Sequence, residues 1–266
     1  MIQTIQQYVV DAFAKEVFTG NQAAVCVVDE WLPDALMCAI ARENNFSETA
    51  FVRKTEKGWA LRWFTPAREI DLCGHATLAS GYTVLNFCEP EADKVVFETK
   101  SGLLTVSRRE GRYEIDLPAY TMHEVLVTQA MTDVIGVEPI AAYMGRDLVC
   151  VLAHEDDVRN AAPEPKAVLT LEGDLLHITA AGERGYETVT RSFAPKLGID
   201  EDPVCGSGHC HVIPVWSERT GGKTEFKAFQ ASKRSGELFC RLAGDRLFIA
   251  GDAALFAKSD IYVPVH

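Results

Sequence analysis

The chain has 266 residues, of which 47% are hydrophobic and 24% charged, and its formal net charge is −12 at pH 7. This composition is typical of a globular protein with a sizeable core and excludes a disordered or fibrous chain. The negative charge argues against a broad nucleic-acid footprint, which needs clustered Lys and Arg to displace counterions from phosphates.

The first predicted element in chain order is a helix over 35–43, with Pro33 and Asp34 near its start. It leads to Asn45-Phe46-Ser47-Glu48, where an apolar strand begins. Segments rich in β-branched and aromatic residues predict strands in both halves of the chain. They lie at 48–52, 61–64, 95–99, 103–107 and 113–117, then at 148–152, 167–171, 175–179, 187–193, 237–242, 246–250 and 254–257. Mostly apolar segments at 76–87 and 209–218 predict two buried helices.

A repeat runs through the chain. Arg62-Trp63-Phe64-Thr65-Pro66 leads to Asp71-Leu72-Cys73-Gly74-His75, and Arg191-Ser192-Phe193-Ala194-Pro195 leads to Asp202-Pro203-Val204-Cys205-Gly206-Ser207-Gly208. In both halves a strand, Phe-x-Pro, Asp and Cys-Gly precede a predicted helix. This order indicates an internal duplication with two lobes, each of strands around a helix. We predict lobes at 1–118 and 119–266; the last strand, near 254–266, could also pack on the first lobe.

Several polar residues near these motifs are candidate site residues. Glu48 could stand at a cleft, although an arbitrary Glu is usually on the surface. His75 would lie at a helix N-terminus, whose field favours neutral imidazole, suited to proton exchange or simply to packing. Asp202 and Ser207 flank the second Cys-Gly and could orient a substrate or relay a proton, or form an ordinary turn with an N-cap Ser. The nearby glycines, Gly206 and Gly208, would let the backbone approach a carboxylate.

Cys73 and Cys205 occupy equivalent repeat positions, and the partial positive charge of a helix N-terminus favours a thiolate. Two such thiols could exchange protons on opposite faces of one carbon, as in a two-base racemase. They could equally be two buried cysteines kept for their size. A zinc site at Cys205, His209, Cys210 and His211 is disfavoured because no Cys-x-x-Cys is present, so we predict no metal.

The first ten residues have neither a basic leader nor a long apolar core, and no later apolar run approaches the roughly 20 residues that span a bilayer. We therefore expect a cytoplasmic protein without membrane contact. Its eight cysteines are scattered through a long chain and are predicted to be free thiols.

These residues resemble a known family, the phenazine-biosynthesis PhzF-like isomerases, within the diaminopimelate epimerase-like fold. The resemblance covers essentially the whole chain. It rests on Asp11-Ala12-Phe13, Phe18-Thr19-Gly20-Asn21, Asn45-Phe46-Ser47-Glu48-Thr49-Ala50-Phe51, Phe64-Thr65-Pro66, Cys73-Gly74-His75-Ala76-Thr77, and Asp202-Pro203-Val204-Cys205-Gly206-Ser207-Gly208.

The resemblance implies an α+β protein whose two similar lobes are each a β-barrel-like sheet around a central helix, with the active site in the cleft between them. It also implies a catalytic glutamate that moves a proton between two substrate carbons without metal or organic cofactor. Glu48 matches that residue, and its buried carboxyl is expected to have a raised pKa. Carried over residue by residue, His75, Asp202 and Ser207 match its polar assistants, and Gly20, Asn21, Gly74 and Gly206 match the substrate-binding backbone.

The chain departs from the phenazine enzymes in having a cysteine at both repeat positions, Cys73 and Cys205. These match the catalytic cysteines of the diaminopimelate epimerases, although the first motif continues as His-Ala where an epimerase typically has Asn-Gly. Three hypotheses follow: a Glu48 isomerase acting on a small-molecule carboxylate, a two-cysteine amino-acid racemase or epimerase, and a non-catalytic metabolite-binding protein. Members of the family are often dimers, so a homodimer is expected from the resemblance alone.

Overall fold

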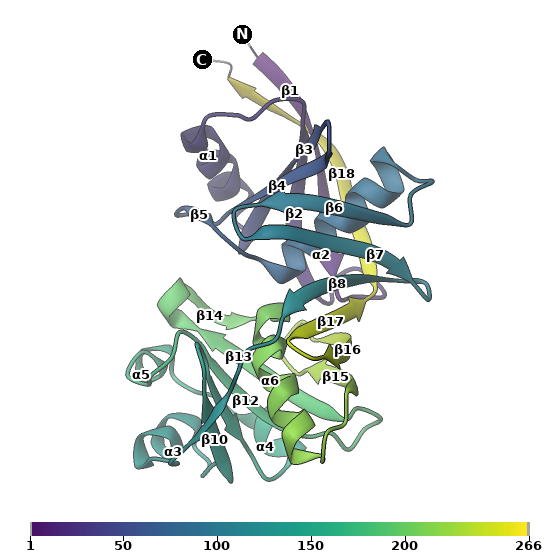
Figure 1. Ribbon diagram of the computed structural model, residues 1–266. Coiled ribbons are helices and arrows are strands. Elements are labelled where there is room, and N and C mark those ends of the chain that lie inside the picture. Colours follow the sequence, from purple (N-terminus) through teal and green to yellow (C-terminus); the bar gives the residue numbers. More distant parts are fainter. Residues whose placement is uncertain (1, 265–266) are drawn as a thin grey trace. The chain divides into compact units, whose positions relative to one another are not determined.

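The computed structural model of the chain describes residues 2–264 (Figure 1). The chain divides into two compact units, Met1–Asp116 with Ala250–His266, and Leu117–Ile249. The C-terminal strand thus belongs to the first unit, where it pairs antiparallel with the N-terminal strand from Ile2↔Pro264 to Ala12↔Ala253. The cysteines are all free, as predicted. None of the helices within residues 2–264 has the length and apolar character needed to cross a membrane.

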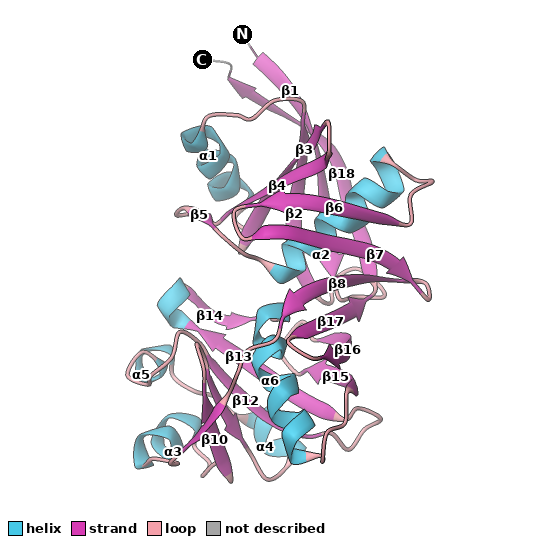
Figure 2. Ribbon diagram, in the orientation of Figure 1, coloured by secondary structure: helices cyan, strands magenta, loops and turns pink. Residues whose placement is uncertain are grey.

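Most elements of the first unit are strands (Figure 2). They are β1 (Ile2–Ala12), β2 (Asn21–Val28), α1 (Asp34–Asn44), β3 (Glu48–Thr55), β4 (Gly58–Phe64), β5 (Glu69–Ile70), α2 (Gly74–Thr83) continuing as a π-helix (Val84–Cys88), β6 (Lys94–Thr99), β7 (Gly102–Arg109), β8 (Arg112–Pro118) and β18 (Ala253–Pro264). The helix α2 packs against β1, β2, β3, β7 and β18, so strands surround it. It is the central helix of this unit.

The sequence of α2 explains how a helix can lie among strands on several sides. Its residues are small and nearly all buried, and Ser80 and Thr83 donate their hydroxyl protons to carbonyls four residues earlier. This satisfies buried hydroxyl groups locally. Gly81 lets β7 approach closely, since a Cβ there would lie 2.3 Å from Cγ1 of Val106. The helix α1 packs on β3 and β4, and Met37 of α1 lies in an apolar cluster with Phe51 and Phe64 of these strands.

The second unit contains β9 (His123–Val125), α3 (Gln129–Ile135), β10 (Ala141–Met144), β11 (Leu148–Val151), α4 (Glu155–Asn160), α5 (Pro165–Val168), β12 (Leu176–Ala181), β13 (Thr188–Ala194), a 3-10 turn (Pro195–Leu197), β14 (Ile199–Asp202), α6 (Gly206–Arg219), β15 (Glu225–Gln230), β16 (Gly236–Ala243) and β17 (Arg246–Gly251). The long helix α6 contacts β12 and β16. The short helices α3, α4 and α5 contribute Met131, Val158 and Val168 to a separate apolar cluster of the same unit.

The strands of the two units pair in the same order. In the first unit β2 is parallel to β3, β3 antiparallel to β4, β4 parallel to β6 and β6 antiparallel to β7. In the second, β11, β12, β13, β15 and β16 repeat this series of parallel and antiparallel pairings. The class is α+β, as expected, and the pairing order is what an internal duplication predicts.

One predicted strand is wrong. The segment 167–171 is rich in apolar residues, but it forms the end of α5 and the turn that follows. Pro165 occupies the first turn of α5, where a missing backbone N–H has no cost, and its fixed φ favours a helical start. Val168 and Leu171 are buried in the apolar cluster of the second unit, so hydrophobicity here reflects packing of a short helix rather than strand pairing.

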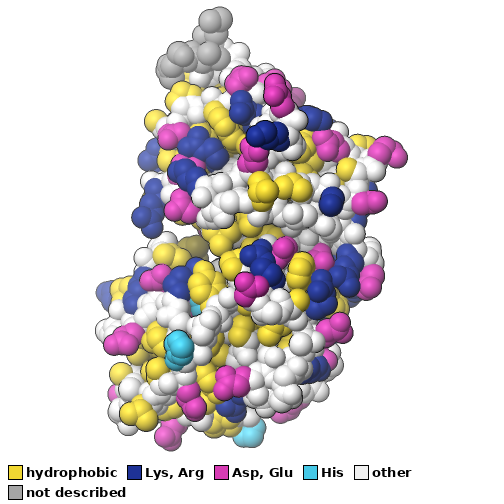
Figure 3. Space-filling model, in the orientation of Figure 1, with side chains coloured by type: hydrophobic (Ala, Val, Ile, Leu, Met, Phe, Trp, Pro, Cys, Tyr) yellow, Lys and Arg dark blue, Asp and Glu magenta, His cyan; other side chains and the backbone are white. Residues whose placement is uncertain are grey.

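The surface carries charges of both signs. On the face drawn in Figure 3, Lys and Arg side chains are interspersed with Asp and Glu over both units. That face therefore has no broad basic patch of the kind that nucleic acids bind.

Candidate active site

Glu48 is placed by the end of a helix. The helix α1 terminates at Asn45, whose left-handed conformation (φ 53°) reverses the chain while its N–H donates to the carbonyl of Ala41 at 3.1 Å. Three residues later Glu48 opens β3, directly opposite Ala23 on the parallel strand β2. Only 8% of Glu48 is exposed, so its carboxylate is held inside the first unit.

Two further candidates stand at the N-terminus of α2. Cys73 is the N-cap residue and His75 is the second residue of the helix. His75 Nε2 lies 3.2 Å from Glu48 Oε2, and His75 Nδ1 lies 3.5 Å from the Cys73 sulfur. The structure therefore brings Glu48, Cys73 and His75 together. Glu48 Oε2 and His75 Nε2 have no hydrogen-bond partner within residues 2–264, so each can still accept or donate to a bound molecule.

The protonation of this pair differs from the expectation. Burial raises the pKa of Glu48. Hydrogen bonding by His75, Ser47 and Cys73 and the charge of His75 lower it by more, so the pKa of Glu48 lies below its ordinary value. Burial lowers the pKa of His75, but Cys73 and Glu48 raise it well above its usual value. The predictions of a raised Glu48 pKa and a neutral His75 are therefore wrong, because each group was considered without the other. At neutral pH the pair is a carboxylate beside an imidazolium.

The two thiols also differ from the expectation that helix N-termini would favour thiolates. Burial raises the pKa of Cys73, and the Glu48 carboxylate raises it further. Burial likewise raises the pKa of Cys205 well above its usual value, with a contribution from Asp202. Complete desolvation and a neighbouring carboxylate outweigh the partial charge of the helix end. Both cysteines are neutral thiols at pH 7.

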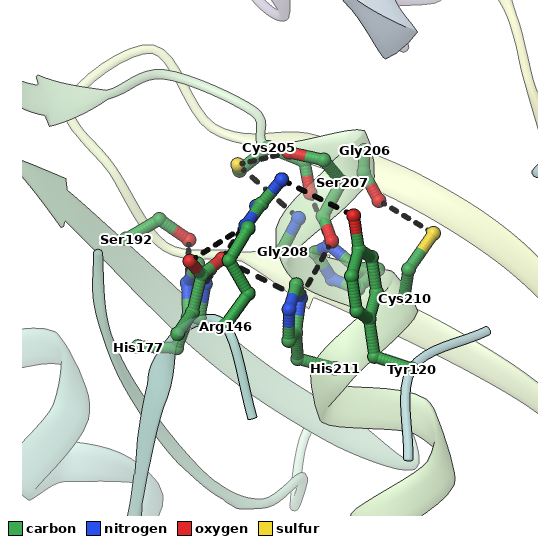
Figure 4. A network of polar contacts seen from close by, with 12 residues as sticks. Tyr120, Arg146, His177, Ser192, Cys205, Gly206, Ser207, Gly208, Cys210 and His211 are labelled. Atoms are coloured by element: carbon green, nitrogen blue, oxygen red, sulfur yellow. Dashed lines mark hydrogen bonds and ion pairs between the residues drawn. The ribbon is translucent and has the colours of Figure 1, made fainter. Parts of the chain in front are cut away.

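The second unit holds the equivalent turn at the start of α6 (Figure 4). Cys205, not Ser207, is the N-cap residue, and its sulfur accepts from the N–H of Gly208 at 3.3 Å. The Ser207 hydroxyl lies 3.5 Å from that sulfur. Asp202 ends β14, and its Oδ1 accepts from the N–H of Val204 at 3.2 Å. Thus Asp202, Cys205 and Ser207 share one turn.

A buried polar network beneath this turn was not predicted. The Asp147 carboxylate accepts from both Nε and Nη2 of Arg146, at 2.9 and 2.7 Å, and lies 3.1 Å from His177 Nε2. His177 Nδ1 lies 2.9 Å from the Ser192 hydroxyl, and His211 Nδ1 lies 3.4 Å from the same Asp147 carboxylate. Asp147, His177, Ser192 and His211 are all buried. No sequence motif marked Asp147 or His177, which lie in the turn between β10 and β11 and on β12.

The predicted substrate-binding glycines have local roles. Gly74 and Gly206 are the first residues of α2 and α6, where N–H groups have no partner within the helix. Gly20 has a positive φ (+67°), and a Cβ there would lie 2.3 Å from the carbonyl oxygen of Ala12. Asn21 opens β2, two residues before the partner of Glu48, and is buried.

The expectation that Gly208 leaves room for a substrate carboxylate is wrong. A Cβ at Gly208 would lie 2.5 Å from Cε1 of His177, so that space belongs to the buried imidazole ring.

Two groups of residues have the ligand types that a metal needs. Within residues 2–264, ligand atoms of Glu48, Cys73 and His75, and of Asp147, His177 and His211, lie within 4.8 Å of one another. In the second group the Arg146 guanidinium occupies both oxygens of Asp147, and a cation already bound there disfavours a metal. Neither group includes Cys205, His209 or Cys210, which make hydrogen bonds of their own.

Comparison with known proteins decides the family. The family described as phenazine biosynthesis-like protein matches residues 10–259. The chain belongs to the PhzF family. An uncharacterised isomerase of Pseudomonas aeruginosa is 42% identical over 253 residues, which cover 95% of this chain and 96% of that protein. The crystal structure of a phenazine biosynthesis protein of the PhzF family from Enterococcus faecalis has a TM-score of 0.95 at 44% identity, covering 98% of this chain and 100% of the other.

The fold of this PhzF-family protein extends to more distant structures. A hydroxyproline epimerase from Agrobacterium vitis has a TM-score of 0.64 at 12% identity, covering 98% of this chain and 93% of that one. This likeness supports the epimerase-like fold and nothing finer. The roles of the site residues and the location of the active site between the two lobes stay predictions.

Proposed function

We propose that this protein is an isomerase that transfers a proton within a small carboxylate-bearing metabolite, with Glu48 as the acid and base. The observation that supports this most is the buried pair of Glu48 and His75, whose Oε2 and Nε2 atoms are 3.2 Å apart and have no other hydrogen-bond partner within residues 2–264. Membership of the PhzF family and relatives named isomerases support the same class of reaction.

The charges of the pair suit proton removal from carbon. Because the pKa of Glu48 is lowered, its carboxylate is ionised before substrate binds and can accept a proton from a substrate carbon. The adjacent imidazolium of His75 can then stabilise the negative charge that develops on the substrate. The neutral Glu48 returns its proton to a different carbon. One proton is removed and one is returned, so the step balances without an oxidant or reductant, and the proposal includes no metal or organic cofactor. A proton held on Glu48 can exchange with solvent before it is returned, which allows heavy water to label the substrate or product.

Asp202 and Ser207 have supporting roles in this proposal. The Ser207 hydroxyl lies at the start of α6, where it can donate to a substrate oxygen beside the first N–H groups of the helix. The Asp202 carboxylate already holds the turn through the N–H of Val204 and can orient the residues that follow it.

A second candidate, a racemase or epimerase using two thiols, is favoured by one specific observation. Cys73 and Cys205 are the N-cap residues of α2 and α6, and both carbonyls accept a side-chain hydrogen bond from four residues later, from Thr77 and His209. Against it, the pKa of both thiols is raised, so neither is the thiolate that such a mechanism requires at neutral pH.

Deuterium incorporation from heavy water into a panel of small carboxylates and amino acids, followed by mass spectrometry, tests the proposal. We expect wild type and Cys73→Ser to exchange a carbon-bound proton of at least one compound, and Glu48→Gln to lose that exchange. Glu69→Gln is the matched control, because Glu69 is a partly buried carboxylate of the same unit that pairs with Arg62.

The other outcomes separate the alternatives. Exchange lost in Cys73→Ser and kept in Glu48→Gln would replace the proposal with the two-thiol mechanism. Compounds that raise the melting temperature of wild type without any exchange would indicate a binding protein instead.

A further inference from the structure

We propose that Arg146 is the residue that recognises the substrate carboxylate. The inference rests on the proposed function, which requires a small carboxylate, but it concerns a residue that neither the repeat nor the family resemblance marked. It is carried by the hydrogen bonds of the Arg146 guanidinium, by its partial exposure and by its place at the start of α6.

One edge of the guanidinium is fixed. Nε and Nη2 donate to the two oxygens of Asp147 at 2.9 and 2.7 Å, and the Asp147 side chain is fully buried. His177 Nε2 lies 3.1 Å from that carboxylate, and His211 Nδ1 lies 3.4 Å from it and 3.0 Å from the Ser207 carbonyl oxygen. The Tyr120 ring stacks on His211 and lies 5.1 Å from the guanidinium carbon. The side chain of Arg146 is therefore held before any ligand binds.

The other edge remains available. A guanidinium has two N–H groups on each terminal nitrogen. Nη2 uses one for Asp147, and Nη1 uses one for the Tyr120 hydroxyl at 3.3 Å. One N–H on each terminal nitrogen has no partner in the described part of the chain, and 34% of the Arg146 side chain is exposed. Such an edge matches the two oxygens of a carboxylate.

The guanidinium belongs to the second unit, as do the candidate residues Asp202 and Ser207. Figure 4 shows the guanidinium directed toward the turn that carries Cys205 and Ser207. Contacts link the two places: His211 Nδ1 lies 3.4 Å from the Asp147 carboxylate that holds Arg146, and 3.0 Å from the Ser207 carbonyl oxygen. The first N–H groups of the 14-residue helix α6 start at the same turn and favour an anion.

The net charge of the whole chain makes a local cation favourable for binding an acidic molecule. A net charge of −12 repels acidic molecules at long range. Arg146 supplies a positive charge at the turn. Burial lowers the pKa of Arg146, but Asp147 raises it above its ordinary value, so the guanidinium stays charged at neutral pH.

An Arg–carboxylate pair elsewhere in the second unit provides a matched control. Arg159 donates to Glu155 at 2.6 Å; the Arg159 side chain is 23% exposed and that of Glu155 is 1% exposed. This pair has the same chemistry as Arg146 and Asp147, but both of its residues lie on the short helix α4.

The test is ligand-observed NMR titration with benzoate and its neutral analogue benzamide. Wild type should bind benzoate at least about tenfold more tightly than benzamide, and Arg159→Met should keep that preference. Arg146→Met should lose it, and so should the double variant Arg146→Met with Asp147→Asn, which removes both charges and leaves no unpaired buried carboxylate. Thermal unfolding checks that each variant is folded.

Binding and turnover report on different hypotheses. For a carboxylate substrate that exchanges deuterium, Arg146→Met should raise KM far more than it lowers kcat. Glu48→Gln should bind benzoate as wild type does and should lose deuterium exchange. The inference is overturned if wild type shows no preference for benzoate, or if folded Arg146 variants keep it. Benzoate recognition that depends on Arg146, without exchange in any compound, would refute the proposed function alone.

Discussion

The Nε2 atom of His75 lies 3.2 Å from the Oε2 atom of Glu48, and both side chains are buried in the first unit. This distance makes the two groups one electrostatic pair. Burial disfavours the charged form of both groups, since it raises the pKa of Glu48 and lowers that of His75. The interactions between the two groups and with their neighbours outweigh burial, so the carboxylate is ionised and the imidazole is protonated. The chemistry expected of Glu48 therefore depends on His75.

Removal of this partner should change the pH dependence of proton exchange. In His75→Asn the burial that raises the pKa of Glu48 is no longer offset by an imidazolium. The acidic limb of the rate profile should therefore move to higher pH, and exchange at neutral pH should fall by about 10² to 10⁴. The exposed His123 on β9 provides the control, His123→Asn, which should behave as wild type. An unmoved acidic limb in His75→Asn would show that the pair does not set the protonation of the base.

Thiol labelling should separate the cysteines by burial. Cys73 and Cys205 are buried thiols with raised pKa, whereas Cys38 is only partly buried. Iodoacetamide at pH 7.5 should therefore modify Cys38 before either of them, because the thiolate is the reactive form and must also be reached. Peptide mass spectrometry gives the order of modification. Fastest labelling at Cys73 or Cys205 would count in favour of the two-thiol mechanism.

A methyl group at Gly208 should destabilise the second unit. In an ordinary helix interior, Gly→Ala stabilises by about 1 kcal/mol. At Gly208 the new Cβ would lie 2.5 Å from Cε1 of His177, whose ring is held by Ser192 and Asp147. We expect Gly208→Ala to lower the free energy of unfolding by about 1 to 3 kcal/mol, measured by urea denaturation. A stabilised variant would mean that the His177 ring moves easily, which would contradict a fixed network under Arg146.

Two buried histidines should make stability fall as pH falls. Burial is the main cause that lowers the pKa of His209 and of His211, each to about 4. Between about pH 6.5 and 4, therefore, the unfolded chain binds protons that the folded chain does not, so the free energy of unfolding decreases with decreasing pH. Between pH 5 and 6 each group contributes about 1.4 kcal/mol per pH unit.

His75 contributes a slope of opposite sign, because its raised pKa keeps it protonated in the folded chain while the unfolded imidazole loses protons near pH 6; this contribution is small below about pH 5.5. His209→Gln should remove about half of the histidine contribution, as measured by urea denaturation at pH 5.0, 5.5 and 6.0. An unchanged slope in this variant would show that His209 is protonated in the folded protein.

The sequence by itself determined many of the local elements and the resemblance to the family, although β1, β2, β10, β15, α3 and α4 were not predicted. Pro33 and Asp34 marked the start of α1, and the repeated Phe-x-Pro and Cys-Gly motifs marked β4 and α2, then β13 and α6. These features depend on neighbouring residues, because capping and strand patterning act over a few positions. The prediction failed at 167–171, where the apolar residues alone do not distinguish a strand from a short buried helix.

Tertiary structure decided the charges and the network around the candidate site. Glu48 and His75 are 27 positions apart by their numbering, and Asp147, His177 and His211 are further apart still, so no local pattern could place them in contact. A pKa depends on desolvation and on charges within a few ångströms, and both are known only once the strands and helices pack. The sequence identified Glu48 as a candidate, but packing set its protonation and placed Arg146 beside the α6 turn.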